Sequence, residues 1–325
     1  MSCVHPFHAF RTGYKTETGK DDLILVRFPA PKSISLDSVK KRVSLDNAPH
    51  HIENGHVWLD EPAVVPCGSC VGCRMNKAKE WKVRNCLELM YRKEAYFITL
   101  TYDDAHLPRD DKGIPILVKS DLQNFFKRLR NYIDCRYFAC GEYGENTCRP
   151  HFHILLYAHL EGAFQLIGVS RFTNELISKC WTFGNHVLEY VTPGSIAYVS
   201  GYVEKKQNDP NWHLYPVKPF ITMSRKPGIG MEWLADHMDV IQATKKVYGR
   251  FADDVRATSA SLPKAFKDKL AGLEWFEQWK ELAKLNEEST EATIRAVYRL
   301  VDSSLISDSQ EAGYIASISK KRRTL

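Results

Sequence analysis

The distribution of apolar and polar residues along the middle of the chain predicts a series of short strands. Some segments alternate between apolar and polar positions, and others are apolar and rich in β-branched or aromatic residues, with turn residues between them. Such strands are expected at residues 23–28, 56–59, 95–102, 136–143, 151–157, 186–191 and 220–223. A turn containing Gly and Asn joins 136–143 to 151–157, so these two segments should form a hairpin.

Apolar residues at helical spacing predict helices between and after these strands. The expected helices cover residues 74–93, 120–132 and 173–180, a segment that begins after Thr192, and a region that starts near residue 262. Four apolar residues recur at helical intervals in that last region: Phe266, Leu270, Leu273 and Phe276. An antiparallel sheet with helices packed against it is an α+β fold.

Three regions are expected along this chain of 325 residues. Residues 1–94 would form an N-terminal module that ends in a basic helix. Residues 95–260 would form the domain with the hairpin sheet, and residues 261–325 a helical extension with a basic tail. The length allows one large domain or two modest ones.

The bulk composition is ordinary for a soluble globular protein. Apolar residues make up 44% of the chain and charged residues 26%, and no stretch has the length and apolarity of a membrane span. The net charge of +6 permits nucleic-acid binding without demanding it. The first residues lack the features of a signal peptide, and nine cysteines, an odd number, argue against a disulfide framework. We therefore expect a cytoplasmic protein and exclude a membrane protein.

A His-x-His pair lies in the predicted strand 151–157. Side chains two residues apart in a strand point to the same face, so His151 and His153 should lie side by side. Two neutral imidazoles in this arrangement can hold one divalent metal ion. Taken alone, two stacked histidines without a metal are the simpler explanation.

The helix after Thr192 carries two tyrosines on one face. Thr192 is suited to the N-cap and Pro193 to the first helical position. Tyr198 and Tyr202 are four residues apart, so their phenols lie together, and Lys205 follows on the same stripe. Taken alone, this pattern is also typical of an amphipathic helix with two aromatic core residues.

Three cysteines at intervals of three residues precede the first predicted long helix. Cys67, Cys70 and Cys73 supply three of the four ligands of a tetrahedral zinc site. Cys3 is the candidate for the fourth ligand, with His5 or His8 as alternatives. An iron–sulfur cluster is less favoured because no fourth cysteine follows nearby.

Three motifs follow one another in an order that is known from one family. The first is the apolar strand at residues 97–102, the second is residues 151–153, and the third is residues 198–205. In this set the chain resembles the HUH endonucleases, and most closely the gokushovirus-like replication initiators of microviruses, which are phages with single-stranded DNA genomes. Three further segments extend the resemblance over about residues 66–230: residues 67–73, 140–144 and 224–230.

The resemblance implies an endonuclease that nicks single-stranded origin DNA in rolling-circle replication. Tyr198 and Tyr202 would attack alternately, leaving a 5′-phosphotyrosyl link and a free 3′-hydroxyl, and the second attack would rejoin the displaced strand. A phenol with a pKa of about 10 must be activated for this. Lys205 would stabilise the developing negative charge, with Lys206 as the alternative.

A metal ion at the two histidines would act as a Lewis acid on the scissile phosphate. Glu142 is the candidate for a third ligand because it lies on the strand that pairs with the histidine strand, and Glu145, nearer the turn, is the alternative. Imidazole with carboxylate suits Mg²⁺ or Mn²⁺, and such a site can also take zinc or nickel in vitro.

Basic residues near such a site are expected to contact DNA phosphates, although each basic run alone is typical of a solvated surface. They are Lys77, Lys79, Lys82, Arg84, Lys127, Arg128, Arg130, Arg225 and Lys226. Tyr143 or Trp181 could stack on unpaired bases. The expected partners are a single-stranded DNA origin and the host replication helicase and polymerase, without a membrane.

Two other functions fit parts of this pattern. A transposase or a conjugative relaxase shares the chemistry, although relaxases usually carry their tyrosine near the N-terminus. A non-catalytic, zinc-stabilised nucleic-acid-binding protein would use the same histidines and tyrosines as structural residues. That second function predicts that Tyr198→Phe combined with Tyr202→Phe leaves all activity unchanged.

Overall fold

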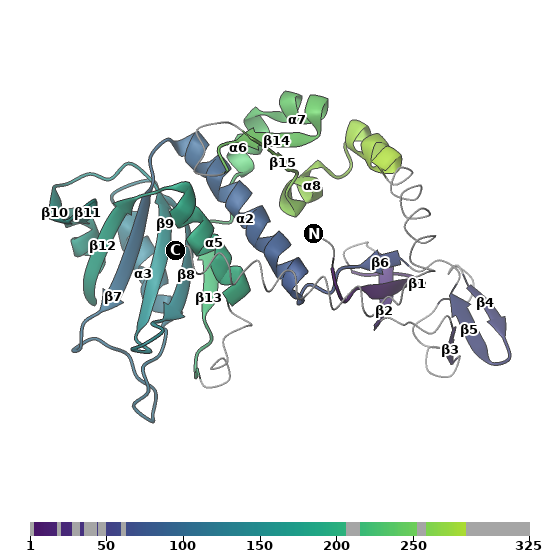
Figure 1. The fold of residues 1–325 in the computed structure, drawn as a ribbon, viewed down its shortest axis with the longest axis horizontal. Coiled ribbons are helices and arrows are strands. Elements are labelled where there is room, and N and C mark those ends of the chain that lie inside the picture. The colour runs from purple at the N-terminus through teal and green to yellow at the C-terminus, as the bar shows by residue number, and fades with distance from the viewer. Residues whose placement is uncertain are drawn as a thin grey trace. The chain divides into compact units, whose positions relative to one another are not determined.

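The computed structural model divides the chain into two compact units, residues 1–76 and residues 77–289 (Figure 1). It describes residues 3–17, 21–27, 33–35, 44, 50–59, 63–205, 215–251 and 258–283. No helix within these residues has both the length and the apolar character that crossing a bilayer requires.

The first unit contains two small antiparallel sheets. One has the order β2 (Asp21–Arg27), β1 (Phe7–Lys15), β6 (Ala63–Val65), and the other the order β3 (Ser33–Ser35), β5 (His56–Leu59), β4 (His50–Glu53). The strands expected at residues 23–28 and 56–59 are confirmed as β2 and β5. Sequence patterns missed the other four, of which three have only three or four residues and are too short to show a period.

The second unit is built on a seven-stranded sheet in which every pairing is antiparallel. The strand order is β10 (Phe164–Gly168), β11 (Arg171–Asn174), β12 (Gly184–Tyr190), β7 (Tyr96–Tyr102), β9 (Pro150–Tyr157), β8 (Arg136–Tyr143), β13 (Phe220–Met223). The expected α+β fold is therefore confirmed, and so is the hairpin, which is formed by β8 and β9. This hairpin lies near the centre of the sheet.

One face of the sheet packs against α3 (Lys119–Leu129) and α4 (Glu175–Cys180). The alternation of β7 places Ile98 and Leu100 on this face, where they join Phe125 of α3 in one buried cluster. The expected helix at 173–180 begins later, at Glu175, because residues 171–174 form β11. Asn174 then caps α4 by accepting a hydrogen bond from the Ile177 N–H.

The opposite face of the sheet is covered by α2 (Val71–Arg92) and α5 (Pro193–Lys205), and Figure 1 shows α5 beside β8 and β9. Leu155 and Tyr157 of β9 and Phe138 of β8 point to this face. They pack with Ile196 and Val199 of α5 in a second buried cluster. This cluster holds α5 on the sheet, next to the strand that carries the two histidines.

The region after residue 230 packs on α2 through a third cluster, which includes Leu87 of that helix. Its elements are α6 (Met231–Asp236), α7 (Met238–Thr244), β14 (Lys246–Gly249), β15 (Thr258–Ser261) and α8 (Lys264–Leu270), followed by helical residues 274–283. The expected burial of Phe266, Leu270 and Phe276 is confirmed, whereas Leu273 is 38% exposed. Leu273 lies in the turn between the two helices, so helical periodicity does not apply there. The basic tail lies outside the described residues.

Candidate active site

The β8–β9 hairpin brings Glu142, His151 and His153 together, and we call these three residues the triad. Glu142 pairs directly with His151 across the hairpin. Its Oε1 lies 3.0 Å from Nε2 of His151 and 2.9 Å from Nε2 of His153. The three potential ligand atoms lie within 4.8 Å of one another. Glu145, the alternative ligand, is an exposed turn residue and is not part of this group.

The charge on Glu142 is held by its neighbours. Burial alone would raise the pKa of this carboxyl, but hydrogen bonds from His151 and His153 outweigh burial and lower the pKa to about 2. The side chain is only 12% exposed. Glu142 is therefore a buried carboxylate that remains ionised at neutral pH, which is the form that binds metal ions.

The orientation of His151 fits a metal ligand. Its Nδ1 lies 3.1 Å from the carbonyl oxygen of Arg149, and because a carbonyl can only accept, Nδ1 carries the proton. In a neutral ring, Nε2 then presents a lone pair to the Glu142 oxygen 3.0 Å away. Two acceptors at that distance repel each other, so the arrangement requires a proton or a cation between them. A divalent cation bound by both groups satisfies this requirement.

Thr99 of β7 is a site residue that sequence patterns did not assign. Its hydroxyl lies 3.0 Å from Nδ1 of His153, and the two residues pair directly between β7 and β9. The hydrogen bond orients the ring so that Nε2 faces Glu142. Phe97, on the same face of β7, stacks on the other side of the site with its ring centroid 5.3 Å from that of His153. The only available signal was the strand register, which the sequence did not define.

The helix α5 places both tyrosines beside His153. Thr192 caps the helix as expected, since its hydroxyl accepts from the Ser195 N–H at 3.1 Å and its own N–H donates to Ser195 Oγ at 2.9 Å. Ring centroids of Tyr198 and Tyr202 lie 5.4 Å and 6.1 Å from that of His153. The hydroxyl of Tyr202 donates to that of Tyr198.

The two tyrosines differ in exposure and acidity. Tyr198 is 43% exposed, whereas Tyr202 is 5% exposed. Burial raises the pKa of Tyr198 to about 12. Burial and the nearby carboxylate of Glu142 raise the pKa of Tyr202 further. Neither phenol ionises at neutral pH by itself, so either would need a cation or a proton acceptor to become a nucleophile. Lys205 is the last residue of α5, but its side chain and Lys206 lie outside the described residues.

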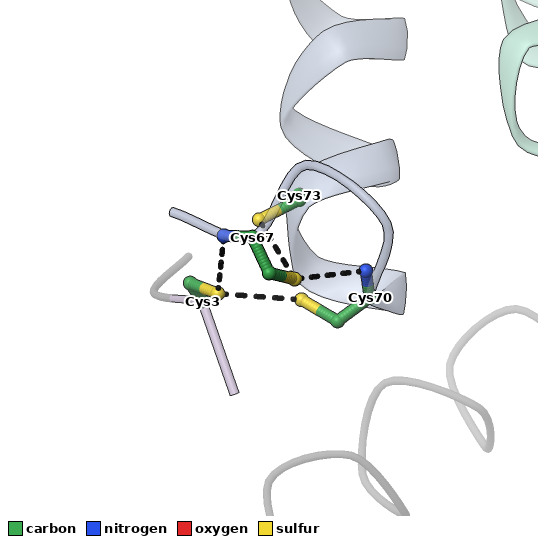
Figure 2. Close-up of side chains that lie close together, drawn as sticks. All are labelled: Cys3, Cys67, Cys70 and Cys73. Carbon is green, nitrogen blue, oxygen red and sulfur yellow. Dashed lines mark hydrogen bonds between the residues drawn. The ribbon is translucent and has the colours of Figure 1, made fainter. Parts of the chain in front are cut away.

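Four cysteines of the first unit form a second group, which we call the cysteine cluster: Cys3, Cys67, Cys70 and Cys73 (Figure 2). Their sulfur atoms lie within 4.8 Å of one another, and neither His5 nor His8 contributes an atom to this group. Backbone N–H groups of Cys67 and Cys70 donate to the sulfurs of Cys3 and Cys67 at 3.3 and 3.2 Å. Burial would raise the pKa of Cys67, but hydrogen bonds, first from the Cys70 backbone, lower it to about 6.

The structure separates the basic residues into sets on opposite faces of the sheet. Lys127, Arg128 and Arg130 belong to α3, across the sheet from the tyrosines. Lys77 and Lys79 are exposed on α2, and Lys82 is half-buried there. Arg84 is engaged within the fold, because its guanidinium lies 4.2 Å from the Trp81 ring and its Nε donates to the Ile229 carbonyl at 2.9 Å.

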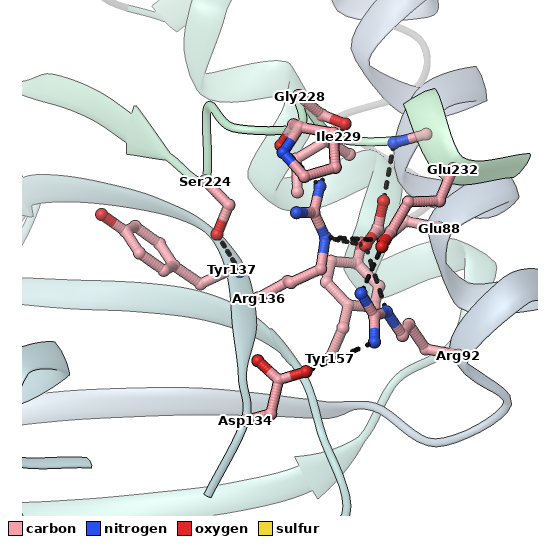
Figure 3. A network of polar contacts seen from close by, with 12 residues as sticks. Glu88, Arg92, Asp134, Arg136, Tyr137, Tyr157, Ser224, Gly228, Ile229 and Glu232 are labelled. Atoms are coloured by element: carbon pink, nitrogen blue, oxygen red, sulfur yellow. Dashed lines mark hydrogen bonds and ion pairs between the residues drawn. The ribbon is translucent and has the colours of Figure 1, made fainter. Parts of the chain in front are cut away.

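A buried ion-pair network holds the loop that carries Arg225 and Lys226 (Figure 3). Arg136 of β8 pairs with Glu88 of α2 and donates to the carbonyls of Pro227 and Gly228 at 2.9 and 3.0 Å. Glu88 also accepts from the Gly230 N–H at 2.6 Å. Both exposed basic side chains therefore extend from a loop whose base is fixed.

The expected stacking of unpaired bases on Tyr143 or Trp181 is wrong. Tyr143 is 7% exposed and donates its hydroxyl to the Val217 carbonyl at 2.9 Å. Trp181 is 1% exposed and packs in the cluster between the sheet and α3. A base could reach neither ring without opening the core.

These features describe an α+β protein in which metal-binding side chains on a central hairpin face a pair of helical tyrosines. Comparison with known proteins gives the same stretch a family. The family model that carries the description Replication-associated protein ORF2 matches residues 95–207, which include the triad and both tyrosines. No solved structure matches the chain.

Three curated phage proteins are similar to the chain. Replication-associated protein ORF2 of Spiroplasma virus 4 is 32% identical over 228 residues, which cover 66% of this chain and 70% of that protein. Replication-associated protein VP4 of Bdellovibrio phage phiMH2K is 33% identical over 184 residues, covering 52% and 57%. Replication-associated protein ORF4 of Chlamydia phage 1 is 30% identical over 159 residues, covering 44% and 38%. The chain belongs to this family of phage replication-associated proteins, which confirms the resemblance to microvirus replication initiators.

Proposed function

We propose that the protein initiates rolling-circle replication by nicking single-stranded phage origin DNA and later rejoining the displaced strand. The observation that carries this proposal is the placement of Tyr198 and Tyr202 against the triad. The chain's family supports a role in phage replication. The nicking chemistry is our inference from the site.

The triad would hold one Mg²⁺ or Mn²⁺ ion through the Glu142 carboxylate and Nε2 of both histidines. Bound there, the ion would supply Lewis-acid stabilisation of the scissile phosphate. Three protein ligands leave coordination positions for phosphate oxygens. The buried, ionised state of Glu142 supports this assignment.

In the proposed reaction, the phenol oxygen of one tyrosine attacks the phosphorus. A phosphorus–tyrosine oxygen bond forms, the bond from phosphorus to the 3′ oxygen breaks, the phenol loses its proton, and the departing 3′ oxygen gains one. The energy of the phosphodiester is retained in the 5′-phosphotyrosyl link, so a second transfer can reseal the strand. Lys205 would stabilise the phenolate or the phosphate charge, and Lys206 is the alternative.

The cysteine cluster would hold a structural Zn²⁺ ion through Cys3, Cys67, Cys70 and Cys73. Four sulfur ligands fill a tetrahedral site, and the backbone N–H bonds to two sulfurs favour thiolates. The ion would connect the start of the chain to the first turn of α2, where Cys73 lies.

DNA phosphates would contact the basic residues in three places. Lys77, Lys79, Lys82 and Arg84 lie on α2, Arg225 and Lys226 on the loop fixed by Glu88 and Arg136, and Lys127, Arg128 and Arg130 on the far face of the sheet. Host helicase and polymerase are the proposed further partners, since the free 3′-hydroxyl would prime synthesis. The reaction would take place in the cytoplasm of the host bacterium.

The test is to incubate the protein with single-stranded phage origin DNA and Mn²⁺ and to look for a covalent protein–DNA adduct on denaturing gels. Wild type, Tyr198→Phe, Tyr202→Phe and the double variant would be compared. Tyr190→Phe is the matched control, because Tyr190 is an exposed tyrosine of β12 outside the site. We expect adduct from wild type and the control and none from the double variant. Bound DNA without adduct from any form would favour the non-catalytic binding protein.

A further inference from the structure

The two halves of the proposed site belong to different elements. The triad is carried by the β8–β9 hairpin, whereas the tyrosines are carried by α5. The distance between a nucleophilic oxygen and a metal-bound phosphate therefore depends on how α5 is placed on the sheet. Most of the contact between α5 and the sheet is apolar, through Ile196, Val199 and Leu155. Apolar packing alone is non-directional and tolerates small rotations and shifts of a helix.

One fully buried polar residue of α2 binds both elements. Asn85 is 0% exposed. Its Oδ1 accepts a hydrogen bond from the Tyr157 hydroxyl at 3.0 Å, and its Nδ2 lies 3.4 Å from Ser200 Oγ and donates to the Trp81 carbonyl at 2.9 Å. Tyr157 and Ser200 are each 1% exposed, so water does not compete for these bonds.

The partners of Asn85 are well placed to transmit its position. Tyr157 lies on β9, four residues after His153 and on the same face of the strand. Ser200 lies on α5, two residues from each tyrosine. A single amide thus connects the strand of the histidines to the helix of the tyrosines.

We propose that Asn85 is a positioning residue that sets the place of α5, and so of Tyr198 and Tyr202, relative to the triad. A buried polar group that is satisfied only in one arrangement selects that arrangement over others of similar apolar packing. Asn85 acts through Tyr157 and Ser200 and touches neither DNA nor metal. This inference rests on the proposed nicking function.

The test measures single-turnover adduct formation at saturating DNA and Mn²⁺ for Asn85→Ala, Ser200→Ala and Tyr157→Phe. Ser200→Ala and Tyr157→Phe each delete one hydroxyl and little volume, so they carry the test even if Asn85→Ala does not fold. A misplacement of about 1 Å at a reacting centre costs roughly 100-fold in rate. We expect the rate constant to fall about 10- to 100-fold in Asn85→Ala and about 3- to 30-fold in the two hydroxyl deletions.

Two further readouts separate positioning from loss of folded protein. Misfolding lowers the amplitude of the adduct, whereas mispositioning lowers its rate constant at full amplitude. The Mn²⁺ dissociation constant, measured by calorimetry without DNA, should change less than about threefold, because the triad does not include α5. The double variant Asn85→Ala with Ser200→Ala should be no slower than Asn85→Ala, since both changes remove the same link.

Leu87→Ala is the matched control, because Leu87 is also 0% exposed on α2 but packs in the third cluster, away from α5. Its rate constant should stay within about threefold of wild type. If the three test variants match Leu87→Ala in rate constant, Asn85 has no positioning role. If wild type itself forms no adduct, the proposed function fails instead.

Discussion

The cysteine cluster and the triad are both groups of metal-binding side chains, but they differ in ligand number, ligand type and neighbours. The cluster offers four sulfurs from the first unit, enough to close a tetrahedral site. The triad offers one carboxylate and two imidazoles on a rigid hairpin, and two phenols lie beside it. A closed site can only hold the fold together, whereas a site with vacant coordination positions can bind a substrate. We therefore assign a structural role to the first and chemistry to the second.

The largest expected effect is on stability and concerns the cysteine cluster. Cys70→Ala should abolish stoichiometric zinc binding and unfold the first unit, because binding free energies of structural zinc are about 10–16 kcal/mol in small domains. Zinc content by mass spectrometry and thermal unfolding report the two losses. Cys148→Ala is the control, since Cys148 is an exposed cysteine outside the cluster. Full zinc content in Cys70→Ala would remove the cluster from the comparison.

The next effect is on activity and concerns the triad. His153→Ala should lower the rate of adduct formation on the order of 10³-fold, the loss expected when charge stabilisation is taken from a reacting centre. Thermal stability should change far less than in Cys70→Ala, because the hairpin keeps its pairing with β7. The comparison would break if His153→Ala lost stability and kept its rate.

A pH dependence of stability should distinguish Glu142 in protein that contains no metal. Because the folded pKa of about 2 lies below the usual value of 4.5, the carboxylate stabilises the fold above pH 4.5 and loses this effect as pH falls towards 2. The shift corresponds to about 3 kcal/mol at neutral pH. Urea unfolding of wild type and Glu142→Gln should differ by about this amount at pH 7, with a shrinking difference below pH 4.5. A constant difference across that range would contradict the ion pairing of Glu142 with the histidines.

The smallest expected effect concerns the hydrogen bond that orients His153. Thr99→Val removes the hydroxyl at Nδ1 of His153 and should weaken Mn²⁺ binding about 10- to 100-fold. Thr101→Val is the control, because Thr101 lies on the same face of β7 but donates its hydroxyl to the Asn185 carbonyl. Calorimetric titration with Mn²⁺ measures both. Equal affinities for the two variants would show that Thr99 does not orient the ligand.

The sequence predicted the parts of the site that depend on local order. Strand periodicity placed His151 and His153 on one face, hairpin pairing put Glu142 opposite them, and helical spacing joined Tyr198 to Tyr202. These relations involve neighbours in one element or one hairpin. They need no knowledge of the rest of the fold.

The parts that the sequence could not predict depend on contacts between distant segments. Thr99 reaches His153 through the β7–β9 register, 54 residues apart, and Asn85 reaches Ser200 over 115 residues. Trp181 shows the same limit from the other side, because an aromatic residue that looks available for stacking is buried by helices and strands far away in the chain. Burial is a property of the packed fold, and no local pattern contains it.

The most direct test of the difference between the two groups is anomalous diffraction from crystals grown with Mn²⁺, recorded at the zinc and manganese absorption edges. The account predicts a zinc signal surrounded by the four sulfurs of the cluster. It also predicts a manganese signal held by Glu142, His151 and His153, with the remaining coordination positions filled by water or phosphate oxygens. A triad without manganese, or a zinc ion there with four protein ligands, would contradict the account.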